Sequence, residues 1–201
     1  MTPQKFEALK DNIITQLKSH LLPGLYYHSP EHTLDVLNAV ERIGQAEKIT
    51  DAEMLLLKTA ALLHDSGYLF TAKNHEENSC RIARLVLTQN DFTNEEIDII
   101  CDLIMATKVP HQPQNKLAEI LCDADLDYLG RKDFSDLSHK LFEEMSIFAK
   151  VKDKDEWNKM QISFFEQHTY YTETSRKLRD SLKEKHLQDI RLLLISNKRI
   201  V

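Results

Sequence analysis

The sequence predicts an all-α protein, and three observations support this prediction. The chain has only four glycines and five prolines among its 201 residues, so few positions interrupt a helix. The β-branched alternation typical of strands is scarce. Apolar residues instead recur at helical spacing, as Ile97, Ile100 and Ile104 do. We therefore expect a single domain over residues 1–201, built as a bundle of about eight or nine helices.

The first two helices are delimited by their end signals. An amphipathic segment runs from Pro3 to Leu22 and is stopped by the sequence LLPG. The next helix should begin after Ser29, with Pro30 in its first turn, because proline is well tolerated at that position. We expect it to continue to about Ala46.

A third helix, capped by Thr50 and Asp51, carries the apolar stretches 55–57 and 60–63. Its nearly continuous apolar character places it in the middle of the bundle. The sequence TKVPHQPQNK, with two prolines, is the clearest irregular connection. The remaining helices are expected at about Asn74–Thr88, Thr93–Thr107, Asn115–Leu129, Phe134–Val151, Asp155–His168 and Thr172–Ser196.

Composition excludes several classes of protein. The chain has 26 basic and 32 acidic residues, and this net charge of -6 argues against a protein that wraps long nucleic acid. No apolar stretch has the length of a membrane span, and the segment MTPQKFEALK lacks the apolar core of a signal peptide. We expect a soluble, cytoplasmic protein. Cys80, Cys101 and Cys122 are widely spaced, which favours buried free thiols over disulfides or a thiolate zinc site.

The segment KTAALLHDSGYLF places His64 and Asp65 directly after an apolar run. A buried carboxylate without a partner is costly, so this position needs an explanation. One reading is a helix end that reaches solvent. The other is a metal ion that neutralises Asp65.

Two further segments hold candidate metal ligands. In YYHSPEHTLDV, His28 and His32 are four residues apart, so both imidazoles can face one cavity. In EILCDADLDYLGR, Asp123, Asp125 and Asp127 repel one another unless a cation or solvent intervenes. A solvated helical face is the alternative for these acids. Imidazoles and carboxylates together suit a divalent ion such as Mn²⁺, Fe²⁺, Mg²⁺ or Zn²⁺.

From about Tyr26 to Gly130 the sequence resembles the HD superfamily of metal-dependent phosphohydrolases, whose pattern is a His, a later His-Asp doublet and a final Asp. The resemblance implies an HD-type helical bundle with a motif-bearing core at about residues 26–130 and C-terminal helices, residues 134–198, packing on it. It implies that one metal ion is held by His32, His64, Asp65 and Asp125.

The segment YHSPEHTLDV is also similar to the opening motif of class I cyclic nucleotide phosphodiesterases. That similarity implies that His28 donates a proton to the leaving group while His32 binds metal. The sequence DADL resembles the CADL of those enzymes, which selects Asp125 over Asp123 as the last ligand. They continue the doublet with Asp-His, whereas this chain has SGY, and their purine-gripping glutamine has no clear counterpart. A dedicated cyclic nucleotide phosphodiesterase is therefore not supported.

Binuclear members of the superfamily add histidines for a second metal. His75 fits the first of these positions, but Thr107 stands where the second is expected, and His111 is only a loose substitute. Asp123 is a further candidate for a second metal or phosphate site. We expect one firmly held metal and keep a weaker second site as a hypothesis.

The resemblance implies hydrolysis of a phosphoester or phosphoanhydride bond in a nucleotide or a small phosphorylated metabolite, with His28 and Asp65 as the catalytic residues. The alternative is a nucleotide-binding sensor or partner-binding module without turnover, but the complete ligand set favours an enzyme. Di-iron oxygenase chemistry would need more histidines. A homodimer through an exposed apolar helix face stays open. The candidate substrate-pocket residues, each of which also fits a solvated surface or a helix boundary, are Lys58, Arg131, His168, Tyr171 and Arg179.

Overall fold

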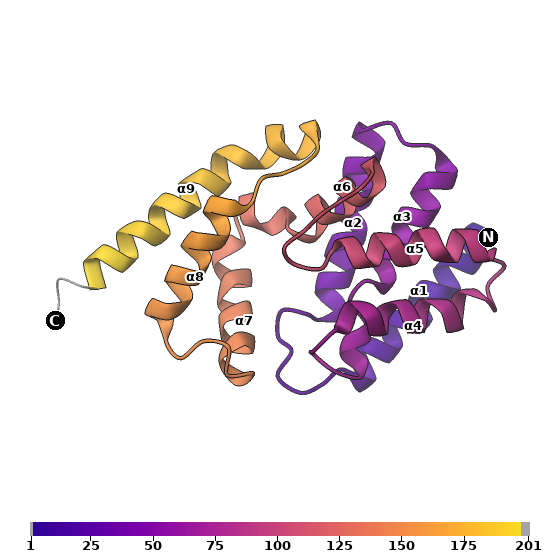
Figure 1. Cartoon of the computed structure of the whole chain (residues 1–201), viewed down its shortest axis with the longest axis horizontal. Helices are drawn as coiled ribbons and strands as arrows, with labels where there is room; N and C mark the ends of the chain where they lie inside the picture. Colours follow the sequence, from indigo (N-terminus) through magenta and orange to yellow (C-terminus); the bar gives the residue numbers. More distant parts are fainter. Residues whose placement is uncertain (1, 198–201) are drawn as a thin grey trace. The chain divides into compact units, whose positions relative to one another are not determined.

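The computed structural model describes residues 2–197, and over this range all regular structure is helical (Figure 1). Nine α-helices and two short 3₁₀ helices are present there, which confirms the predicted fold class. Met1 and residue 198, where the predicted C-terminal helices end, lie outside the described residues. Over the same range, no helix combines the length and apolar character needed to cross a membrane.

The chain divides into two compact units at Asp125 and Leu126, and each is described by itself. Whether the C-terminal helices pack on the motif-bearing core stays a prediction. The first unit contains α1 (Pro3–His20), α2 (Pro30–Ala46), α3 (Asp51–Leu63), η1 (Ser66–Leu69), α4 (His75–Leu87), α5 (Asn94–Ala106) and α6 (Lys116–Asp125).

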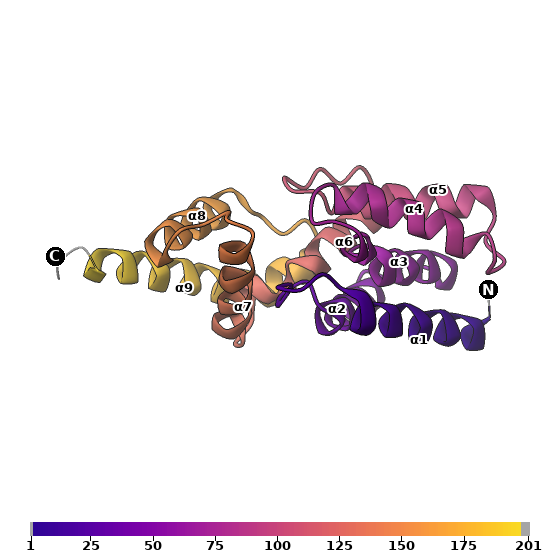
Figure 2. The same cartoon turned by 90° about the horizontal axis from the view of Figure 1, so that it is seen from below.

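Helix α3 lies at the centre of the first unit, between the α1–α2 pair and the α4–α5 pair (Figure 2). Leu57 and the four residues of its last turn, 60–63, are completely buried. This confirms the position expected from the continuous apolar character of the helix. The His64–Asp65 doublet follows directly, so the most buried helix of the unit delivers these two side chains into its interior.

Helix starts in this unit follow local capping chemistry. Ser29 accepts a hydrogen bond from the backbone N–H of His32, and Pro30 opens α2. Thr50 with Glu53, and Thr93 with Glu96, form reciprocal capping boxes at α3 and α5. These interactions span only three residues, which is why the sequence predicts the starts of these helices closely.

Helix α6 is shorter than expected. It ends at Asp125, Leu126 leaves the helical conformation (φ -104°, ψ 15°), and η2 (Asp127–Gly130) follows. The prediction of one helix to Leu129 is therefore wrong, because the chain tightens into a separate 3₁₀ turn. Asp123 and Asp127, expected on one helix face, belong to different elements.

The second unit contains η2, α7 (Phe134–Ile147), α8 (Lys154–Gln167) and α9 (Glu173–Asn197). Helix α7 ends four residues before the predicted Val151, because Ala149 adopts a left-handed conformation (φ 54°). The backbone N–H of Lys150 then donates to the carbonyl of Met145 at 2.8 Å and closes the helix end.

Close contacts join the elements of the second unit to one another, and two of them illustrate this. Ser138 on α7 donates to the side-chain oxygen of Gln161 on α8 at 2.6 Å. Gly130 at the end of η2 packs so closely on α9 that an added Cβ would lie 2.4 Å from the carbonyl oxygen of Arg179. Glycine is thus required where η2 meets α9.

Candidate metal centre

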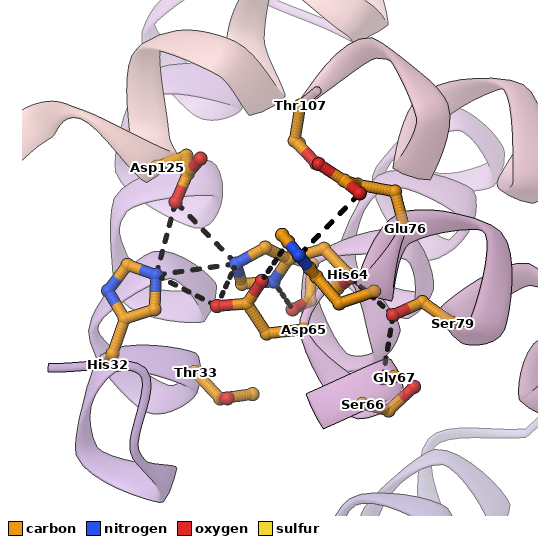
Figure 3. Close-up of polar contacts among 12 residues, drawn as sticks. His32, Thr33, His64, Asp65, Ser66, Gly67, Glu76, Ser79, Thr107 and Asp125 are labelled. Atoms are coloured by element: carbon orange, nitrogen blue, oxygen red, sulfur yellow. Dashed lines mark hydrogen bonds and ion pairs between the residues drawn. The ribbon is translucent and has the colours of Figure 1, made fainter. Parts of the chain in front are cut away.

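Four side chains from three parts of the first unit converge on one point (Figure 3). His32 lies in the first turn of α2, His64 and Asp65 directly follow α3, and Asp125 ends α6. The Nε2 atoms of His32 and His64 are 3.3 Å apart. Asp125 Oδ1 lies 3.1 Å from His32 Nε2 and 3.5 Å from His64 Nε2. The two imidazoles thus present the same ring nitrogen to a shared set of carboxylate oxygens.

The orientation of His64 is fixed by its backbone. Its Nδ1 lies 2.8 Å from the carbonyl oxygen of Ala61. Because a carbonyl only accepts hydrogen bonds, Nδ1 carries a proton, and Nε2 is the ring atom that faces the cluster and can bind a metal once it is deprotonated. This arrangement is the usual one for a histidine that ligates a metal through Nε2.

Asp65 occupies the interior of the cluster. Its Oδ2 is buried and accepts no hydrogen bond, although it lies 3.4 Å from His32 Nε2 and 3.2 Å from His64 Nε2. A buried carboxylate oxygen in this state is costly unless a positive charge sits beside it. The structure therefore explains why an apolar helix ends in two titratable side chains: they face each other across a site that attracts a cation.

The pKa shifts follow from the same geometry. Burial by itself would raise the pKa of Asp65 and of Asp125, but the neighbouring imidazoles outweigh it and lower both pKa values. Burial would lower the pKa of His64, but the carboxylates of Asp65 and Asp125 raise it well above its ordinary value. The cluster thus stabilises positive charge at its centre.

The donor set fits a divalent metal ion. Ligand atoms of His32, His64 and Asp125 all lie within 4.8 Å of one another, close enough to bind one ion together. Asp65 adds the buried Oδ2 between the two imidazoles. Two nitrogens and two carboxylates satisfy a hard or borderline cation and leave positions open for water.

The turn that carries the His64–Asp65 doublet is held by α4 rather than by α3 alone. Ser79 donates to the carbonyl oxygen of His64 at 2.5 Å and accepts from the backbone N–H of Gly67 at 2.8 Å. A Cβ on Gly67 would lie 1.9 Å from the carbonyl oxygen of His75, so no other residue fits. Sequence reasoning missed Ser79, since a serine 15 residues from His64 gives no local signal.

Three rings border the centre. The ring of Tyr68 stacks 4.5 Å from that of His28 and 4.1 Å from that of His75, measured between centroids. His28 is half-buried, and its ring lies 5.9 Å from that of His32. His28 is thus next to the ligand cluster without being part of it. No signal in the sequence indicates that Tyr68 stacks between these two rings.

The residues proposed for a second metal lie at different distances from the first. His75 Nε2 lies 3.5 Å from Asp65 Oδ1, and its Nδ1 lies 3.5 Å from a carboxylate oxygen of the buried Glu76. His111 Nε2 lies 3.9 Å from Asp125 Oδ2. Thr107 donates its hydroxyl proton to the carbonyl of Ile104.

Asp123 is completely buried and lies outside the metal-binding group found among the described residues.

Burial lowers the pKa of His75, so its ring favours the neutral form, which can ligate a metal. A weaker second site at His75 stays a prediction.

The candidate pocket residues are placed as follows. Lys58 pairs with Glu41 and lies 4.9 Å over the ring of Phe6, so its charge is used between helices of the first unit. In the second unit, Arg179 donates two hydrogen bonds to Asp127, at 2.8 and 2.9 Å. Their assignment to a substrate pocket stays a prediction.

The other three also have partners within the second unit. Arg131 donates to Asp133 at 2.9 Å, and its guanidinium lies 3.8 Å from Asp127. The carbonyl of Tyr171 accepts from Arg176 at 2.7 Å. The ring of His168 packs edge-on against Tyr170, with centroids 4.7 Å apart.

Comparison with known proteins places this geometry in a family. Residues 31–127 match the HD domain, a range that includes His32, His64, Asp65 and Asp125. Among curated proteins, none matches the chain in sequence.

Two crystal structures share its fold. A predicted HD superfamily hydrolase from an uncultured Thermotogales bacterium is 20% identical, with a TM-score of 0.61 over 94% of this chain and 91% of that one. Bacillus subtilis YpgQ, in complex with ADP, is 19% identical, with a TM-score of 0.65 over 94% of this chain and 95% of that one. At such identities the likeness shows the fold alone. The family match and the shared fold together show that residues 31–127 of this chain form an HD domain.

Proposed function

We propose that the protein is a metal-dependent phosphohydrolase that cleaves a phosphoester or phosphoanhydride bond in a nucleotide or a small phosphorylated metabolite. The observation that carries the proposal is the meeting of His32 Nε2 and His64 Nε2, 3.3 Å apart, with the carboxylates of Asp65 and Asp125. The structural likeness to a predicted HD superfamily hydrolase supports the same reaction class.

The ligand set would be His32, His64, Asp65 and Asp125, with Mn²⁺, Fe²⁺, Mg²⁺ or Zn²⁺ as the ion. When bound there, a divalent ion supplies Lewis acidity, which lowers the pKa of a water and polarises a phosphoryl oxygen. The protein's own task is to keep both Nε2 lone pairs directed inward, as the Ala61 carbonyl does for His64. Asp65 would accept a hydrogen bond from the attacking water through a carboxylate oxygen.

His28 is the proposed general acid. It is half-buried beside the ligand cluster, and its ring is held against Tyr68 with centroids 4.5 Å apart. An imidazole titrates near neutral pH, so it can give a proton to a departing oxygen and regain it in each turnover.

A nucleotide is the substrate class we favour. The Bacillus subtilis YpgQ structure was determined with ADP, and the two folds correspond over nearly the whole chain. The net charge of -6 does not favour a long nucleic acid. A free nucleotide can offer the phosphate oxygens that a divalent ion binds.

The test is product release from a panel of nucleotides and small phosphoesters, using protein stripped with a chelator and resupplied with Mn²⁺. His64→Gln is the blank, because it removes one inward-facing ring nitrogen. His139→Gln is the matched control, since His139 is exposed on α7.

Turnover that needs Mn²⁺, disappears in His64→Gln and persists in His139→Gln would establish the activity. Stoichiometric metal binding without turnover of any substrate would favour a nucleotide sensor instead. Turnover that survives His64→Gln would contradict the proposed site.

A further inference from the structure

A pair of thiols lies between α4 and α5, apart from the metal ligands. Cys80 Sγ is 3.4 Å from the carbonyl oxygen of Cys101, and Cys101 Sγ is 3.7 Å from the carbonyl oxygen of Cys80. Because each sulfur reaches the other residue's backbone, the two side chains lie across the same point of the helix interface. Each thiol therefore donates toward the backbone of the other cysteine.

The neighbouring residues reinforce this register. Arg84, one turn after Cys80, pairs at 2.7 Å with Asp98, which precedes Cys101 by about one turn. Pairing of 80 with 101 and of 84 with 98 means that the two helices run antiparallel, as they do in Figure 1. The ion pair is solvent-exposed and Cys80 is half-buried, whereas Cys101 is buried, so a small molecule reaches the pair from the side of Cys80.

The pKa values of the two thiols are shifted in opposite directions. The neighbouring Cys80 thiol lowers the pKa of Cys101, and the Arg84 guanidinium acts in the same direction against the effect of burial. The neighbouring Cys101 side chain, together with burial, raises the pKa of Cys80. Cys101 therefore loses its proton more readily than Cys80, and the thiolate is the form that reacts with a peroxide.

Cys122 offers an internal contrast. It is buried in α6, and its thiol donates to the carbonyl of Ala106 at 3.1 Å. Burial raises the pKa of this thiol. Cys122 therefore has neither a thiol partner in its contacts nor thiolate character, and it should resist oxidation.

We propose that Cys80 and Cys101 form a modification site, a dithiol that a peroxide oxidises to a disulfide linking α4 to α5. In the first step one sulfur attacks a peroxide oxygen, the O–O bond breaks, and a sulfenic acid and water (or an alcohol) form. In the second, the other sulfur attacks the sulfenic sulfur, the S–O bond breaks and a second water leaves. Two thiols lose two electrons and two protons in total, and one peroxide is reduced.

The disulfide would affect the His64–Asp65 turn of the first unit through α4. Ser79, the residue before Cys80, holds both His64 and Gly67 through its hydroxyl. A covalent tie from Cys80 to α5 would restrain the helix segment that supports the His64–Asp65 turn.

The test treats the full-length chain with hydrogen peroxide under native conditions and without thiol reductant. Free thiols are titrated before and after, and linked peptides are mapped by mass spectrometry. Cys80→Ala and Cys101→Ala each remove one partner, and Cys122→Ala is the matched control. Circular dichroism of each variant shows that it is folded, and Cys101→Ser replaces Cys101→Ala if that variant is not.

The expected result is loss of two of the three thiols, recovery of a peptide joining Cys80 to Cys101, and return of both thiols with dithiothreitol. The same linkage should form in Cys122→Ala and be absent from the Cys80 and Cys101 variants. Retention of all three thiols, or oxidation of Cys80 and Cys101 as separate sulfinic acids without a linked peptide, would overturn the proposal.

Discussion

Asp65 in the first unit and Asp127 in the second are both buried aspartates, but their neighbours differ. Asp65 faces two imidazole Nε2 atoms, at 3.4 and 3.2 Å, and its Oδ2 accepts no hydrogen bond. Asp127 receives two hydrogen bonds from the guanidinium of Arg179, at 2.8 and 2.9 Å. One carboxylate is left open to a cation from solution, whereas the other has its cation built into the chain.

This difference separates a binding site from a structural ion pair. A bidentate arginine matches both oxygens of a carboxylate and leaves little for a ligand to gain. The two imidazoles lie beside Asp65 without making paired hydrogen bonds to its two oxygens, so binding of a metal ion there would stabilise the folded unit. Burial of an acid therefore identifies a candidate ligand only when its partner is known.

The largest effect is expected for Asp65→Asn. Loss of the central carboxylate should abolish Mn²⁺ retention and reduce phosphohydrolase activity roughly 10⁴-fold, since a catalytic metal contributes several kcal/mol to transition-state stabilisation. In the presence of a chelator at neutral pH, the variant should unfold at a lower denaturant concentration, because the neighbouring imidazoles lower the pKa of Asp65 and its ionised form therefore stabilises the fold.

Mn²⁺ titration and denaturant unfolding measure these two effects, with the exposed Asp136→Asn as control. A variant that kept wild-type metal affinity would show that Asp65 is not a ligand.

The next largest effect is expected for Arg179→Met. It leaves Asp127 buried without its bidentate partner, and breaking such a pair lowers the free energy of unfolding by about 3–5 kcal/mol. Denaturant unfolding measures the loss. The double variant Asp127→Asn/Arg179→Met should recover part of it, because the unpaired charge is then removed as well. If the single variant were as stable as wild type, Asp127 would not depend on Arg179.

His28→Gln should separate catalysis from metal binding at the same site. The ring of His28 lies beside the ligand cluster, 5.9 Å from that of His32, so Mn²⁺ affinity should be unchanged. Turnover should fall about 100-fold, in keeping with loss of a general acid. Substrates with poor leaving groups should lose most. Release of metal by this variant would instead make His28 a ligand.

Gly67→Ala should give a smaller, steric loss. The added Cβ would meet the His75 carbonyl at 1.9 Å, and backbone cannot move aside cheaply, so we expect a loss of about 1–3 kcal/mol in stability. Gly44→Ala is the matched control, since its nearest neighbour is the flexible end of Met54. Thermal unfolding measures the loss of stability in both variants. Equal losses would contradict a specific requirement for glycine at position 67.

The smallest expected effect is the change with pH in the free energy of unfolding of the metal-free protein. The folded-state pKa of His64 is raised, so its contribution to stability is full below the unfolded value of about 6.5 and is lost as pH rises through the folded value. The slope is at most about 1.4 kcal/mol per pH unit for one proton.

Urea unfolding in chelator across this range measures the slope. Asp65 and Asp125 have lowered pKa values and contribute stability above about pH 4, so their effect lies in a separate, acidic range. A flat profile above pH 6.5 would show that the carboxylates do not hold a proton on His64.

The sequence alone determined the all-α class, the starts of most helices and the segments that carry the candidate metal ligands. These features are local: Thr50 and Glu53 cap α3 across three residues, and apolar spacing identifies α5 from within one helix. The early ends of α6 and α7 were not predicted, because a 3₁₀ turn at η2 and a left-handed alanine at Ala149 carry no strong residue signal.

Only the tertiary structure decided which atoms meet. His32 and Asp125 are 93 residues apart, and helix packing alone brings them to 3.1 Å. Packing also turned Ser79 toward His64 and set Cys80 against Cys101, two relations without a pattern in the chain. Residue types and their order define what chemistry is available, whereas side-chain direction at a shared interior depends on contacts between distant helices. For that reason the sequence predicted the kind of site, and the fold determined its geometry.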